Sequence, residues 1–154
     1  METRGMLVGV LVEYLSAVRA RLEGRTTIIP QSAFARGLPD FTESLGVAAR
    51  ESFPQVTADQ VQAMKAKARG LNYRPLRSQI TSLANWLALD LPGDTVEAFV
   101  GARNSLAQRG QFPEGTAPID SFLAMMYVLD QFVLRLFGYS GPYIHRQRQQ
   151  IAHI

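Results

Sequence analysis

Three polar side chains between Asp94 and Phe112 are the candidates for a functional site: Arg103, Asn104 and Gln108. Arg103 falls within an apolar helical stripe, and Asn104 and Gln108 are four residues apart on the flank beside it. A guanidinium is always charged, so placing it among apolar groups costs free energy unless it is paired or lines a cleft. The structural alternative is an arginine that reaches solvent past the core edge or pairs with a carboxylate such as Glu97.

A helix is predicted to carry these residues. Asp94 is a suitable N-cap residue, and Glu97 three residues later completes a capping-box pattern. Gly110 is a suitable stop, and Pro113 cannot continue a helix. The apolar residues of the stripe recur at the spacing of one helix face: Val96, Phe99, Val100, Leu106 and Ala107.

The run Arg-Asn-Ser-Leu-Ala-Gln-Arg-Gly at residues 103–110 resembles the signature helix of the HEPN family of nucleotide-binding domains. That signature has an arginine, then asparagine or another polar residue, then a histidine four to six residues after the arginine. Gln108 occupies the histidine position here. The helical pattern extends the resemblance more loosely over about residues 60–140.

The resemblance implies a prokaryotic defence or toxin lineage whose active members cleave RNA without a metal. In such members the ribose 2′-OH attacks the adjacent phosphate in a cleft at a homodimer interface. Arg103 would neutralise the developing charge, and Asn104 would orient a partner or contact the phosphate. Gln108 cannot replace the histidine, because an amide does not exchange protons near neutral pH. We therefore expect an RNA-binding, endoribonuclease-type domain that is inactive as written, whether Gln108 is natural or engineered.

The amino-acid composition limits which other classes of protein and site the chain can belong to. With 154 residues, 47% of them hydrophobic and 19% charged, the chain is long enough for one globular domain with a real core. It has no cysteine and only two histidines, both in the last ten residues, so we expect no metal site and no cofactor. No segment has the length of a membrane span, and no signal peptide is recognisable, so a cytoplasmic protein is expected.

The apolar patterning predicts an all-α fold, an antiparallel HEPN-like bundle of about five or six helices. We expect one domain over residues 1–138 and a tail or short helix over 139–154. The chain as a whole is a candidate for a domain taken from a longer protein. The expected helices cover about residues 5–23, 40–51, 61–68, 75–89, 94–110 and 119–137. A turn is expected at Gly37–Asp40, a capping box at Thr57 and Gln60, and a core or interface position for Trp86.

The apolar faces of the first and last helices exceed what one small bundle can hide, which predicts a homodimer. RNA is the second expected partner, and an antitoxin or an additional domain the third. The net charge of +3 permits RNA binding without requiring it. Basic residues cluster between residues 65 and 77, although such clusters are more often solvated faces. The alternative function is a non-catalytic dimerisation or interaction module, in which Arg103 forms a structural pair.

Overall fold

The computed structural model describes residues 1–145 and 150–153, and the side chains of residues 1–143. The described part contains six α-helices, a short 3-10 helix and two β-strands, which confirms the predicted all-α class. The elements are α1 Glu2–Leu22, α2 Gln31–Ser52, α3 Ala58–Ala68, η1 Arg69–Asn72, α4 Leu76–Trp86, α5 Gly93–Arg109, α6 Pro118–Leu136, β1 Pro142–His145 and β2 Gln150–His153.

The chain forms two compact units, a division that the expected single domain did not include. The first unit comprises residues 1–24 and 75–154, and the second comprises residues 25–74. The second unit holds seven basic and four acidic residues, so the whole net charge of +3 resides there. The first unit has nine of each sign and is neutral.

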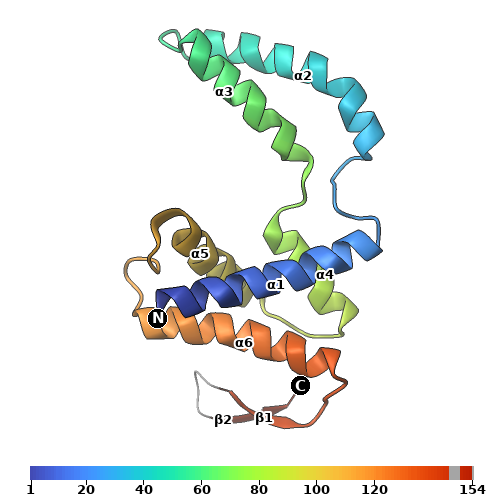
Figure 1. The fold of residues 1–154 in the computed structure, drawn as a ribbon, viewed down its shortest axis with the longest axis vertical. Helices are drawn as coiled ribbons and strands as arrows, with labels where there is room; N and C mark the ends of the chain where they lie inside the picture. The colour runs from blue at the N-terminus through green and yellow to red at the C-terminus, as the bar shows by residue number, and fades with distance from the viewer. Residues whose placement is uncertain (146–149, 154) are drawn as a thin grey trace. The chain divides into compact units, whose positions relative to one another are not determined.

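In the first unit, α1 packs against α4, α5 and α6 around one core. Figure 1 shows α1 and α6 running in the same direction, with α5 running back toward the end at which both begin. The largest fully buried side chains of this unit come from all four of these helices: Val12, Ile80, Leu83, Phe99, Leu106, Met125, Val128 and Phe132. Burial of such side chains stabilises each by about 1.5–3 kcal/mol, and the bundle depends on it.

Small residues let α1 approach α5 closely. An added Cβ on Gly5 would lie 2.7 Å from the ring of Phe112 and 3.0 Å from Leu106 Cδ1. Both neighbours are buried, so neither has room to move away. The approach buries one face of α1 and leaves the opposite face without a partner within this unit.

The tail after α6 does not form the short helix considered from the sequence. Strands β1 and β2 pair antiparallel, with Tyr143 opposite Ala152. Burial raises the pKa of the Tyr143 hydroxyl, and a hydrogen bond with Tyr127 of α6 raises it further. The tail is thereby attached to the outer side of α6, which Figure 1 shows as well.

The second unit is a helical hairpin of α2 and α3, closed by η1. The predicted capping box is confirmed: Thr57 accepts from the Gln60 amide, and the Gln60 side chain accepts from the Thr57 amide. Buried Asn72 ties the base of the hairpin, because its Oδ1 accepts from the Ile29 amide at 2.8 Å and its Nδ2 donates to the Ile29 carbonyl at 3.0 Å.

The turn predicted at Gly37–Asp40 is wrong, because α2 runs through it with Pro39 inside the helix. The Thr42 hydroxyl donates to the Pro39 carbonyl at 2.9 Å, which adds a side-chain bond to the turn that follows the proline. Figure 1 shows α2 bending along its length, as expected for a helix with an internal proline.

Helix starts differ from expectation at two prolines. Pro92 is the N-cap of α5, without a side-chain cap, and Asp94 lies within the first turn, so the predicted Asp94 N-cap is wrong. Pro75 is the N-cap of α4 rather than a first-turn residue, and α4 ends at Trp86. Among the described residues, the helices all lack the combination of length and hydrophobicity that a membrane span requires.

Candidate functional site

Arg103 extends from α5 across α1 and forms an ion pair with Glu13. Its Nη1 also donates to the Asn104 Oδ1 at 3.2 Å. The pair lies at the edge of the core, with the Arg103 side chain 27% exposed and the Glu13 side chain 41% exposed. Arg103 is therefore held by a carboxylate on one side and an amide on the other.

Gly9 makes this crossing possible. An added Cβ on Gly9 would lie 2.9 Å from Arg103 Cγ and 3.4 Å from Met125 Cε. The methylene stem of Arg103 therefore lies directly over the α1 backbone, and its guanidinium reaches the carboxylate one helical turn further on. The apolar stem and the paired head remove the cost of an arginine inside an apolar stripe.

Glu13 is the site residue that the sequence did not identify. It lies 90 residues from Arg103, and it is a lone carboxylate on an otherwise apolar stretch of α1. That isolation was the available signal. Glu97, the carboxylate suggested from the sequence, pairs instead with Arg77 at 2.7 Å on an exposed surface.

We expect Glu13→Gln to lower the free energy of unfolding by about 1 kcal/mol, because it leaves a half-buried guanidinium without its counter-charge. Glu97→Gln is the matched control. Its ion pair is 56% and 59% exposed, so we expect a loss of about 0.5 kcal/mol or less. Urea denaturation at one fixed chain concentration measures both. Equal losses in the two variants would show that the Arg103 pair has no special structural weight.

Gln108 is exposed on the last turn of α5, on the flank that Asn104 begins. The rest of the motif has structural roles. The Ser105 hydroxyl donates to the Gln111 carbonyl at 2.6 Å and accepts from Arg109 at 2.9 Å. Gly110 ends the helix in the left-handed region at φ 70°, which confirms the predicted stop.

The arrangement favours structure over catalysis. The carboxylate of Glu13 neutralises the guanidinium of Arg103, which weakens the attraction that this cation could exert on a phosphate. Asn104 and Gln108 are amides and do not transfer protons near neutral pH. A hollow of about 320 Å³ lies where the start of α1 meets the end of α5. Its lining residues are Glu2, Thr3, Met6, Leu7, Leu106 and Gly110, and they do not include Arg103, Asn104 or Gln108.

Trp86, expected in a core or an interface, is 52% exposed at the end of α4. Arg19 stacks over its ring, 4.5 Å from the centroid, and also pairs with Glu23. The stacked guanidinium covers one face of the ring. Among the described side chains, acidic residues and histidines do not gather in groups of three that could hold a metal ion.

Comparison with known proteins finds no matching family model, curated protein or solved structure.

Proposed function

We propose that this chain is a non-catalytic helical interaction module that forms a homodimer through α1. The observation that carries the proposal is the second apolar face of α1, opposite its buried face. Leu7, Val10, Leu11 and Tyr14 are 64%, 54%, 44% and 65% exposed. An exposed, continuous apolar patch on a helix marks a protein interaction surface.

The spacing of this face suits a second helix. Leu7, Leu11, Tyr14 and Val18 alternate at four and three residues, which is the seam of two helices packed side by side. The hollow beside Leu7 and Met6 offers space for a side chain of a partner. The face is therefore shaped for a helix rather than for a flat surface.

A second copy of the chain is the partner that we favour. A twofold axis brings the same apolar face to both sides, which makes it self-complementary. The unit that carries α1 is neutral, so the two interface-bearing units do not repel each other, and the net charge of +3 on each chain lies in the other unit. The four residues of the seam are uncharged, and the same spacing reaches arginines only at its two ends, Arg4 and Arg21, so the apolar centre disfavours RNA as its occupant.

Sedimentation equilibrium of the chain as written tests the proposal. We expect a species of twice the 17.1 kDa chain mass at tens of micromolar. A monomer over that range would remove the dimer.

The second candidate is the inactive ribonuclease-like domain that the motif resembles. The hydrogen bond between Arg103 and Asn104 and the exposure of Gln108 on the same helix flank support it. Because Glu13 follows Val10 by three residues and precedes Tyr14 by one, a dimer through α1 would bring this group to the rim of the interface. The substitution that tests this candidate is Gln108→His.

A further inference from the structure

We propose that the hollow between α2 and α3 is a binding site for a phosphate monoester carried on a small organic group. The hollow has a volume of about 430 Å³, within the range of small-molecule sites. Its lining residues are Leu38, Pro39 and Thr42 of α2, Gln62, Lys65 and Ala66 of α3, and Arg69, the first residue of η1.

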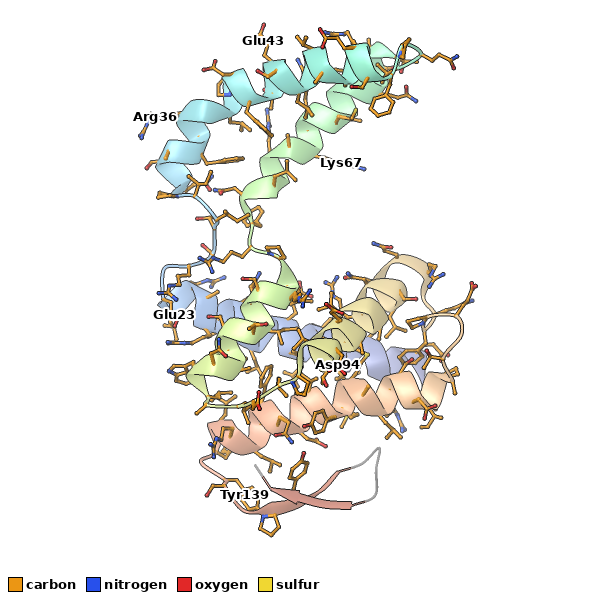
Figure 2. All side chains as sticks on the ribbon, turned by 180° about the vertical axis from the view of Figure 1, so that it is seen from behind. Glu23, Arg36, Glu43, Lys67, Asp94 and Tyr139 are labelled. Atoms are coloured by element: carbon orange, nitrogen blue, oxygen red, sulfur yellow. The ribbon has the colours of Figure 1, made fainter. Side chains whose placement is uncertain are left out.

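The cations of this hollow converge from one helix face. Lys65 of α3 and Arg69, the C-cap residue of that helix, are four residues apart, and Arg69 keeps helical backbone angles, so both side chains reach the same face. None of the four carboxylates of residues 25–74 forms an ion pair with either of them in the part of the chain that the structure describes. Figure 2 shows Glu43 of α2 directed away from α3. Two cations share one hollow without a counter-charge from their own unit.

Gly46, which has no side chain, lets Lys65 lie against α2. An added Cβ at Gly46 would lie 2.6 Å from Lys65 Cε and 3.1 Å from Lys65 Nζ. The lysine is therefore packed against α2 instead of extending into solvent, and it is only partly exposed. A cation that is already positioned loses less side-chain entropy when it binds an anion.

The remaining lining defines the ligand class. The Gln62 amide can donate to a phosphate oxygen, and Lys65 and Arg69 supply charge-assisted bonds, whereas the Thr42 hydroxyl already donates to the Pro39 carbonyl. Leu38, Pro39 and Ala66 form an apolar wall. Inorganic phosphate would leave that wall and most of the volume unused, so the expected ligand carries an apolar or planar group beside its phosphate.

Calorimetric titration of the full chain at about 0.15 M salt, where distant surface charges are screened, tests the site, with a nucleoside 5′-monophosphate as the probe and the unphosphorylated nucleoside as the blank. We expect the monophosphate to bind and the unphosphorylated nucleoside not to bind. Lys65→Gln and Arg69→Gln should each weaken it by about tenfold, because each removes a charge-assisted bond. Gly46→Ala should weaken it several-fold, because the new methyl group displaces Lys65.

Lys67→Gln is the matched control. It removes the same charge from the same helix, but Figure 2 shows Lys67 directed away from α2. We expect its affinity to stay within about twofold of the parent, since surface charges contribute little at a distance. Equal losses for Lys65→Gln and Lys67→Gln would show non-specific charge attraction and overturn the site. Circular dichroism establishes that each variant is folded.

A second titration distinguishes two ligands that carry the same phosphate monoester, a free nucleoside monophosphate and the 5′-end of an RNA. A short RNA with a 5′-phosphate is compared with the same RNA carrying a 5′-hydroxyl. A preference for the phosphorylated end, without binding of the free monophosphate, would support the same hollow as a chain-end site. If the monophosphate and both RNA forms fail to bind, or bind without dependence on Lys65 and Arg69, the proposal is wrong.

Discussion

Leu11→Asp is expected to convert the homodimer into a folded monomer. Leu11 is 44% exposed in the single chain, so the substitution leaves the core of the first unit intact. In the dimer it removes an apolar contact worth about 1.5–3 kcal/mol from each copy. It also places two carboxylates in one apolar seam. Association should weaken by about 10²- to 10⁴-fold, with the helical content unchanged.

Ile119→Asp is the matched control for this experiment. Ile119 is 45% exposed at the start of α6, so the same amount of apolar surface is replaced by the same charge. An aspartate in the first turn is compatible with the helix dipole. Sedimentation equilibrium should show the parental dimer for Ile119→Asp and a monomer for Leu11→Asp. A dimer that survives Leu11→Asp would place the interface elsewhere.

Gln108→His is expected to create measurable cleavage of single-stranded RNA if the site descends from a ribonuclease. The substitution places a titratable imidazole one turn beyond Asn104, on an exposed flank where it can meet a substrate. General acid–base catalysis contributes about 10²- to 10⁴-fold, so the parent should show at most a trace. Cleavage should persist in EDTA and leave 2′,3′-cyclic phosphate ends, as the resemblance implies.

The control is the double variant Gln108→His with Arg103→Ala. It should be silent, because the charge that develops on the phosphate loses its nearest cation. A labelled-RNA assay compares the parent, the single variant and the double variant. If the histidine variant is folded, dimeric and as silent as the parent, the ribonuclease ancestry loses its main support. The interaction module would then be the remaining function.

Local sequence signals identified the features of the fold that depend on neighbouring residues. The capping box at Thr57 and the left-handed stop at Gly110 need only side chains within four residues. They were therefore predictable. The same reasoning failed at Asp94, because the helix begins at Gly93 with Pro92 as its N-cap, which places Asp94 inside the first turn. A proline that pre-sets the helical φ at the start of a helix competes with an N-cap signal.

Pro39 illustrates a second failure. A turn was predicted because glycine, proline and aspartate each break helices when considered alone. In the structure α2 continues through them, and its later turns pack on α3 at Gly46 and Ala49, the two buried residues of the helix. That tertiary packing offsets the missing amide hydrogen bond of the proline, and it is not visible in a local window.

The candidate site was half predictable for a similar reason. The position of Arg103 in an apolar stripe indicated that it required a partner, and in the structure its neighbour Asn104 accepts one of its hydrogen bonds. Glu13 could not be identified, because only the folded bundle brings α1 beside α5. The close passage of Arg103 over Gly9 has the same origin.

The most direct test of dimerisation through α1 is a scan of single cysteines. The chain contains no cysteine, so each introduced thiol is the only one present. Cysteine is placed in turn at Leu7, Leu11, Tyr14 and Val18, with Ile119→Cys as the reference, and each variant is oxidised mildly at a concentration where the parent is dimeric. A disulfide needs Cα atoms within about 7 Å, so it forms only where a position faces its own copy or lies beside the twofold axis. We expect a covalent dimer from at least one α1 position and from none at Ile119. Crosslinking at Ile119, or at none of the four α1 positions, would contradict the α1 interface.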